Sequence, residues 1–187
     1  MTTVTTSVII QKDDPILRRI AKDVSLNDIG GEKLNKIIHE MAATLDKCDD
    51  GVALAAPQIG ISERIFVVSP KTFLLEQECD VTEEAIATSK RTNKLVYINP
   101  IISKRSSKKA ILDEGCLSVR GTFGKIKRHE KVTITAYDEN RAKFTRGASG
   151  LLAEIFQHET DHLDGKLFID TATDLIKLEA KPAPHAK

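Results

Sequence analysis

The sequence predicts one α+β domain in which mainly antiparallel strands pack around a helix near the C-terminal end. Three observations predict this class: an amphipathic helical pattern early in the chain, a strand-rich stretch over residues 110–146, and a second helical pattern over residues 149–163. With 187 residues, 41% of them hydrophobic and 29% charged, the chain can bury a sizeable core. We expect a single domain over residues 1–170 and a short, partly frayed tail over residues 171–187.

Residues 31–48, GEKLNKIIHEMAATLDKC, have the clearest helical pattern. One stripe of this segment is apolar at the helical period, and it consists of Leu34, Ile37, Ile38, Met41 and Leu45. Upstream, Pro15 is suited to a first helical turn. Residues 13–25 are therefore expected to form a short segment attached to the body of the domain.

The next segment is GVALAAPQIG, residues 51–60. Gly51 and Gly60 bracket it, and Pro57 argues against a continuous helix. We expect an apolar loop or a short extended piece. Its one amide side chain, Gln58, is unusual, because loops are normally polar throughout and this one is otherwise apolar.

Strands are expected on both sides of a surface excursion. Residues 64–68, RIFVV, and residues 94–102, KLVYINPII, have strand composition, and Pro100 interrupts the second of them. Residues 70–93 between them are expected to be a variable surface segment with a helical turn in VTEEAIATSK.

The stretch from 110 to 146 carries β-branched and alternating patterns, broken by glycines and by the turn DENR. This pattern predicts antiparallel strands. The second helix is then expected to begin at Ser149, a suitable N-cap, and to run to Leu163. Gly165 is suited to stop it.

Composition excludes several classes of protein. The net charge of +1 gives no overall field toward nucleic acid, and the basic run at residues 103–109 is interpreted as a solvated strand edge. No apolar run approaches the ~20 residues that span a bilayer. The N-terminus lacks a signal-peptide pattern, so a cytoplasmic location is expected.

Of three cysteines, Cys48 and Cys79 have no motif around them and are interpreted as inert thiols.

The strongest chemical signal is QHETDH in the second helix. His158 and His162 are separated by about 40° of rotation and about 6 Å of rise, so both imidazoles can reach one ion. Leu151 and Ile155 share their face of the helix. Glu159 can reach a metal-bound water without being a ligand, an arrangement typical of metal-assisted hydrolysis. The alternative is a polar helix face with chance spacing.

A catalytic metal site usually has three protein ligands, so a third must come from elsewhere. The longer metalloprotease pattern H-E-x-x-H-x-x-G-x-x-H fits as far as Gly165 but has Phe168 where the last histidine would stand. Glu179 is a remote candidate in the tail. Cys116, in DEGCLSV, is the stronger candidate, because a Cys/His/His set is a recognised open site.

Three segments together resemble the signature motifs of peptide deformylases, in that family's order: GVALAAPQIG, EGCLS and QHETDH. IIQKDDPILRRIAK and KRHEKVTITAYDEN are also similar, so the resemblance covers about residues 8–170. It implies a peptide deformylase-like α+β fold with antiparallel sheets around a C-terminal metal-binding helix. It also implies a hydrolase that removes the N-formyl group from the formylmethionine of nascent polypeptides and releases formate.

The resemblance implies that Cys116, His158 and His162 hold one divalent metal ion. Fe2+ is native in many family members and is expected here. Zn2+, Ni2+ or Co2+ would also suit a thiolate with two imidazoles, so the sequence does not name the ion.

The resemblance also implies the catalytic residues. Glu159 would be the general base, and the oxyanion donors would be the Gln58 side-chain amide and the backbone N–H of Leu117. This role would explain why an apolar loop carries one amide.

The substrate implied by the family is an N-formylmethionyl peptide. Its backbone is expected to pair with the first motif along Gly51, Val52 and Ala53, with Gly115 leaving room for it. Ile155 is expected to contact substrate from the second helix.

Glu114, also among the expected substrate-site residues, is predicted to support the site through an arginine, and Arg128 is the candidate partner. A salt bridge that only supports the fold is an equal alternative.

Three positions depart from the family pattern: Ala53 replaces a usual glycine, Arg120 a usual proline, and Glu154 an arginine or apolar residue. We expect Ala53 to alter affinity rather than chemistry. Arg120 could contact substrate further along or face solvent. Glu154 would make the methionine pocket less apolar.

The sequence is also compatible with two other functions. One is a zinc-dependent endopeptidase of the H-E-x-x-H type, and the other is a non-catalytic deformylase-like metal-binding protein. For the deformylase, the implied partners are the formyl-peptide and, transiently, the ribosome. We expect a monomer with no direct nucleic-acid contact and no membrane association.

Overall fold

The computed structural model describes residues 6–78, 80–93 and 95–178. Cys79 and Glu179, which the sequence brought into consideration, lie outside the described residues. The strands are β1 Ala53–Ala55, β2 Ile65–Val68, β3 Val96–Arg105, β4 Lys109–Gly115, β5 Thr122–His129, β6 Lys131–Tyr137, β7 Lys143–Ser149 and β8 Thr173–Lys177. The α-helices are α1 Glu32–Asp46, α2 Pro70–Glu76, α3 Glu83–Thr92 and α4 Gly150–Leu163, and the 3-10 helices are η1 Pro15–Arg18, η2 Ala56–Ile59 and η3 Phe168–Asp170.

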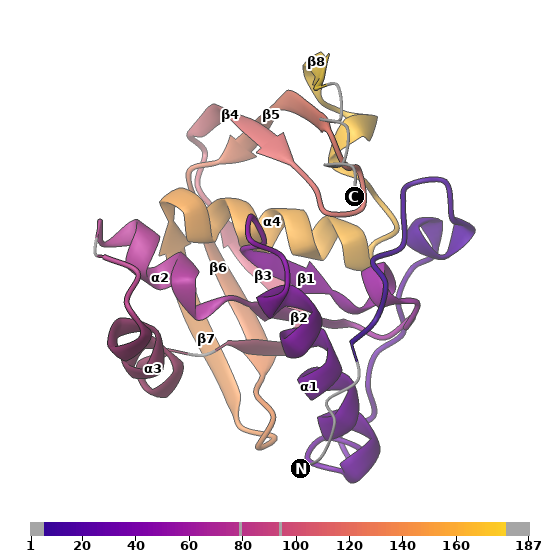
Figure 1. Ribbon diagram of the computed structural model, residues 1–187, viewed down its shortest axis with the longest axis vertical. Coiled ribbons are helices and arrows are strands. Elements are labelled where there is room, and N and C mark those ends of the chain that lie inside the picture. The colour runs from indigo at the N-terminus through magenta and orange to yellow at the C-terminus, as the bar shows by residue number, and fades with distance from the viewer. Residues whose placement is uncertain (1–5, 79, 94, 179–187) are drawn as a thin grey trace, which may run out of the picture.

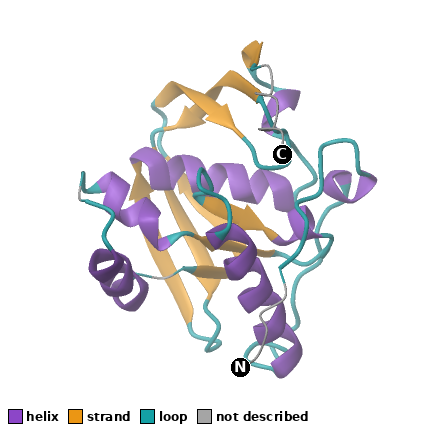
Figure 2. Ribbon diagram, viewed as in Figure 1, coloured by secondary structure: helices purple, strands orange, loops and turns teal. Residues whose placement is uncertain are grey.

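Two antiparallel sheets lie on either side of helix α4 (Figures 1 and 2). The larger sheet has the order β1-β2-β3-β6-β7, and the smaller one has the order β4-β5-β8. On the larger sheet, Phe66 of β2 stacks on Tyr97 of β3 with ring centroids 4.6 Å apart, and Phe156 of α4 lies 4.9 Å from Tyr97. The predicted α+β class, with antiparallel sheets around the C-terminal helix, is confirmed.

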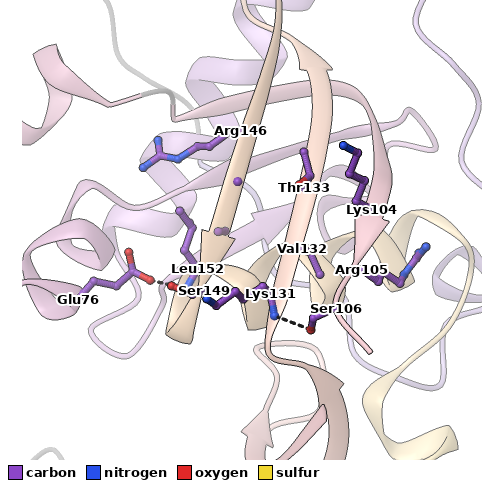
Figure 3. A pocket seen from close by; sticks show the side chains of 12 residues that line it. Glu76, Lys104, Arg105, Ser106, Lys131, Val132, Thr133, Arg146, Ser149 and Leu152 are labelled. Atoms are coloured by element: carbon purple, nitrogen blue, oxygen red, sulfur yellow. Dashed lines mark hydrogen bonds between the residues drawn. The ribbon is translucent and has the colours of Figure 1, made fainter. Parts of the chain in front are cut away.

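Both ends of α4 are fixed by specific contacts. Ser149 stands at the predicted N-cap, but its side chain makes no capping hydrogen bond. The carboxylate of Glu76, at the end of α2, instead accepts the backbone N–H of Leu152 at 2.8 Å (Figure 3). At the other end the N–H of Lys166 donates to the carbonyl of Asp161 at 2.8 Å, the pattern of a Schellman cap.

Gly165 makes that cap possible. Its φ of +72° lies in the left-handed region, and a Cβ added there would lie 2.7 Å from the carbonyl oxygen of Arg18. Only glycine fits both conditions without strain. The predicted stop at Gly165 is therefore correct for a reason that includes a tertiary contact.

The structure differs from the sequence expectations in three segments. Strand β3 continues through Pro100, because a register shift between Ile98 and Ile101 and a φ of +49° at Asn99 accommodate the missing donor. Residues 70–93 contain two helices, α2 and α3, rather than a single helical turn.

The third difference concerns the tail. Thr173–Lys177 form strand β8, which pairs with β5 in the register Phe123 with Ile176. Within the tail that we expected to be partly frayed, this segment is therefore ordered as a strand, because the edge of β5 supplies the hydrogen-bonding partner. Residues 179–187 lie outside the described part of the chain.

Candidate active site

Two distant parts of the chain meet at the cluster that the sequence predicted. His158 and His162 project from α4, and Cys116 follows directly after the last residue of β4. The Sγ of Cys116 lies 3.2 Å from Nε2 of His162, and one ligand atom from each of the three residues lies within 4.8 Å of the others. Metal–ligand bonds of about 2.0–2.3 Å place tetrahedral ligand atoms roughly 3.4–3.8 Å apart, so the three residues fit a single ion.

Glu114 orients the first histidine. Its carboxylate oxygen lies 2.9 Å from Nδ1 of His158. Because a carboxylate can only accept, Nδ1 donates to it, which makes Nε2 the nitrogen that would bind an ion once it has lost its proton. Glu114 is 2% exposed and does not line the pocket beside the cluster, so it lies behind the cluster rather than on the substrate side.

Arg128 on β5 completes this buried network. Its Nε and Nη2 donate to the two oxygens of Glu114 at 2.6 and 3.0 Å, and its Nη1 donates to Asp161 at 2.5 Å. The predicted pairing of Glu114 with Arg128 is confirmed. The sequence analysis missed Asp161, although its position three residues after His158 on the same helix was a signal that could have found it.

Gln58 points its amide at the cluster from η2. The side chain is 2% exposed, and its Nε2 lies 3.7 Å from the Sγ of Cys116 and 3.1 Å from the Oγ of Ser118. Its Oε1 accepts the backbone N–H of Ala55 at 2.8 Å, which fixes the orientation of the amide. Ser118 was not predicted, because its role depends on the turn after Cys116 that brings it against Gln58.

Glu159 is 4% exposed, and its Oε2 is buried with no hydrogen-bond partner among the described residues. Burial raises the pKa of Glu159 to about 7; the charges of His158 and Arg128 lower it by smaller amounts, and the charge of Glu114 raises it further. A carboxyl group with a pKa near neutrality can both take up and release a proton at working pH.

The two histidines experience opposite electrostatic effects. Burial lowers the pKa of His162 well below its usual value, and the positive charges of His158 and Arg128 lower it further. His162 is therefore neutral, the form that binds a metal. Burial also disfavours a charged His158, but hydrogen bonds to Cys116 and Glu114 reverse the direction and raise its pKa.

Comparisons with known proteins agree with this geometry. The family model for polypeptide deformylase matches residues 6–177. The chain belongs to the polypeptide deformylase family.

Among its relatives, the chain is 39% identical over 163 residues to peptide deformylase 1A, chloroplastic/mitochondrial, of Arabidopsis thaliana, a match covering 87% of this chain and 60% of the plant protein. It is 39% identical over 165 residues to peptide deformylase 2 of Clostridium acetobutylicum, covering 88% of this chain and 94% of the relative. The chain thus spans about 60% of the plant relative's length.

Solved structures have the same fold. A peptide deformylase from Legionella pneumophila matches with a TM-score of 0.74 and 35% identity, covering 91% of this chain and 88% of that one. A Plasmodium falciparum peptide deformylase in complex with an inhibitor matches with a TM-score of 0.71 and 35% identity, covering 89% and 90%. The peptide deformylase-like fold expected from the motifs is confirmed.

A pocket of about 280 Å3 opens beside the Cys/His cluster. Its walls include the three predicted catalytic residues, Gln58, Leu117 and Glu159. They also include two of the three predicted metal ligands, Cys116 and His158. The predicted substrate residues on the walls are Gly51, Val52, Ala53, Gly115 and Ile155. Glu114 is absent from these walls. The third ligand, His162, is 1% exposed and lies deeper.

Gly115 also has a structural reason to be glycine. A Cβ added there would lie 2.7 Å from the ring of Phe123, so this glycine makes room for an aromatic side chain, and its expected role beside the substrate stays a prediction. Phe123 is itself part of the pocket wall. Sequence analysis missed it, because only the β4–β5 pairing of Gly115 with Phe123 brings the ring there.

The three departures from the family pattern all lie on the pocket walls. Ala53 is 5% exposed in β1. Arg120 donates to both oxygens of Asp50, at 3.0 and 2.8 Å, so it forms an exposed ion pair at the pocket. Burial raises the pKa of Glu154 to about 7, and the nearby charge of Glu114 raises it as well.

A second, larger groove of about 560 Å3 lies at the ends of β3, β6 and β7 (Figure 3). Lys104, Arg105, Lys131 and Arg146 line it, and it shares no lining residue with the pocket at the cluster. The basic run at residues 103–109 is largely exposed here, as the sequence predicted.

In the described part of the chain, no helix is long and apolar enough to cross a membrane.

Proposed function

We propose that this chain removes the N-formyl group from the formylmethionine of nascent polypeptides and releases formate. The observation that carries the proposal is the buried Glu159, with one unpartnered carboxylate oxygen, next to three ligand atoms that fit one ion. Family membership supports the same reaction. A crystal structure of the class I type b peptide deformylase from Acinetobacter baumannii has Met-Ala-Ser bound, which supports a peptide substrate that begins with methionine here.

Cys116, His158 and His162 would hold one divalent metal ion, and Glu114 would keep His158 in the tautomer that binds it. When bound, the ion would act as a Lewis acid toward water and the formyl oxygen. Fe2+ is our first candidate, with Zn2+, Ni2+ and Co2+ as alternatives for this donor set.

Glu159 would take a proton from water and later give it to the leaving amine. The formamide C–N bond breaks, the formyl carbon gains the oxygen of water, and formate and a free N-terminal amine result. The Gln58 amide, oriented by Ala55, and the backbone N–H of Leu117 would stabilise the charge that develops on the formyl oxygen.

A zinc-dependent endopeptidase is the less favoured alternative. Such an enzyme would need a third ligand other than Cys116, but Phe168 lies where the longer motif needs histidine and packs 6.3 Å, centroid to centroid, from the ring of His158. A non-catalytic metal-binding role is also less favoured, because the base and all three ligands are present. We further propose a cytoplasmic monomer that contacts the ribosome transiently.

The test is formate release from formyl-Met-Ala by anaerobically prepared protein, with metal analysis of the same sample. We expect turnover together with about one equivalent of metal, and loss of both in Cys116→Ala. Retained metal and cleavage of internal peptide bonds by Cys116→Ala would support the endopeptidase instead. Inactivation in air with recovery on nickel substitution would indicate iron, whereas equal activity with and without air would indicate zinc.

A further inference from the structure

The proposed chemistry does not use two acidic residues of the pocket, Asp50 and Glu154, and of these Asp50 is paired with Arg120. Glu154 is half-buried on the face of α4 that also carries Leu151, Ile155 and His158, and it stands one helical turn before His158. All four residues line the pocket of about 280 Å3 beside the cluster. Glu154 therefore places a carboxyl group on the wall that leads to the reacting atoms.

The nearest buried cation is already committed. Arg128 donates to both oxygens of Glu114 and to Asp161, which uses Nε, Nη1 and Nη2. Glu114 takes its third donor from His158. Arg128 thus pairs with two carboxylates through three of its five N–H groups, and no ion pair joins it to Glu154.

Glu154 accordingly has no hydrogen bond or ion pair with any of the residues that the structure describes. It also lines a neighbouring cleft together with Arg128 and Lys131, and no ion pair joins it to either of them there. A half-buried carboxyl group without a donor is unfavourable, and a ligand that supplies a donor would relieve this cost.

We infer that Glu154 is a specificity-determining residue that makes the pocket accept N-formyl peptides whose first side chain ends in a hydrogen-bond donor, such as lysine, alongside methionine. The inference rests on the proposed function. Leu151 and Ile155 on either side contact the apolar stem of such a side chain, while Glu154 accepts from its end. Lysine and methionine are unbranched and of similar length, so both suit one pocket and differ chiefly at the end of the side chain.

The experiment compares kcat/KM for formyl-Met-Ala-Ser and formyl-Lys-Ala-Ser in the metal-loaded protein and in Glu154→Leu. Charge-assisted hydrogen bonds typically contribute about tenfold or more to such ratios, and partial exposure reduces this. We expect the preference for methionine over lysine to rise at least fivefold in Glu154→Leu. A rise of less than fivefold overturns the inference.

Glu139→Gln is the matched control, because it removes one exposed carboxylate outside the pocket, and its ratio should equal that of wild type. If Glu154→Leu does not fold, as judged by its thermal transition, Glu154→Gln replaces it with the same threshold.

A second readout separates this inference from the proposed function. Calorimetric titration measures the affinities of wild type and Glu154→Leu for the product peptides Met-Ala-Ser and Lys-Ala-Ser. The ratio of the affinity for Met-Ala-Ser to that for Lys-Ala-Ser should rise at least fivefold in Glu154→Leu, whether or not formate is released. If wild type releases no formate from either formyl peptide, the proposed function fails and product binding still decides the role of Glu154. If formate is released but the ratio is unchanged in Glu154→Leu, only the inference fails.

Discussion

Replacement of Glu114 by glutamine tests whether the buried network behind the cluster supports both the fold and the metal site. The wild-type carboxylate accepts three hydrogen bonds, two from Arg128 and one from His158. Glutamine keeps the shape but removes the charge, and its NH2 group faces donors where the second oxygen accepted. The guanidinium of Arg128, with its side chain only 9% exposed, then retains Asp161 as its one carboxylate partner.

The magnitude follows from this burial. Removing one member of a buried ion pair typically costs about 3–5 kcal/mol, because the remaining charge is left uncompensated. We expect the lower end, about 3 kcal/mol in the free energy of unfolding, since Asp161 remains. For a domain of this size that corresponds to a fall in Tm of roughly 6–12 °C. Loss of the acceptor for His158 should also weaken metal binding by about 10–100-fold.

The assay is urea unfolding with and without a chelator, together with zinc titration against a competing chelator. The neighbouring residue provides the control: Asp113 on the same strand pairs with Lys125 on β5, but both side chains are largely exposed. Asp113→Asn should unfold and bind zinc like wild type. Equal losses in the two variants, or a metal affinity unchanged in Glu114→Gln, would refute this reasoning.

Three further predictions concern the catalytic groups and the end of α4. Glu159→Ala should bind metal like wild type but lose about 10²–10⁴-fold in kcat on formyl-Met-Ala, and wild-type turnover would disprove its role as base. Gln58→Ala should lose about 10²–10³-fold in kcat with metal affinity nearly unchanged, measured on the same samples; a loss confined to metal binding would contradict an oxyanion role. Gly165→Ala should destabilise the fold by about 1 kcal/mol or more in urea unfolding, because its Cβ would meet the carbonyl of Arg18. Gly147→Ala, where a Cβ meets nothing within 4 Å, is its control, and equal stability of both variants would exclude the contact as the cause.

Several features could be predicted because they depend on local order in the sequence. The helical period defined α1 and α4, and the four-residue spacing placed His158 and His162 on one face. Alternating patterns predicted the strands between residues 110 and 146. Glycine at 165 predicted the end of α4, because its backbone conformation is a local property.

Other features depended on contacts between distant segments, which the sequence does not encode in its spacing. The capping group of α4 is Glu76 rather than the adjacent Ser149, and strand β8 exists because β5 offers it an edge. Ser118 was missed for the same reason, since its partner Gln58 lies 60 residues away, whereas Asp161 had a local signal in its spacing from His158 on α4.

The sequence by itself determined which residue types were available for the metal centre, through the three motifs and their order. Only the tertiary structure decided how these residues are used: it brings Cys116 within 3.2 Å of His162, buries Glu159, and places Glu154 where none of the described residues donates to it. The physical reason is that ligand geometry, burial and hydrogen-bond satisfaction are properties of packing between segments far apart in the chain.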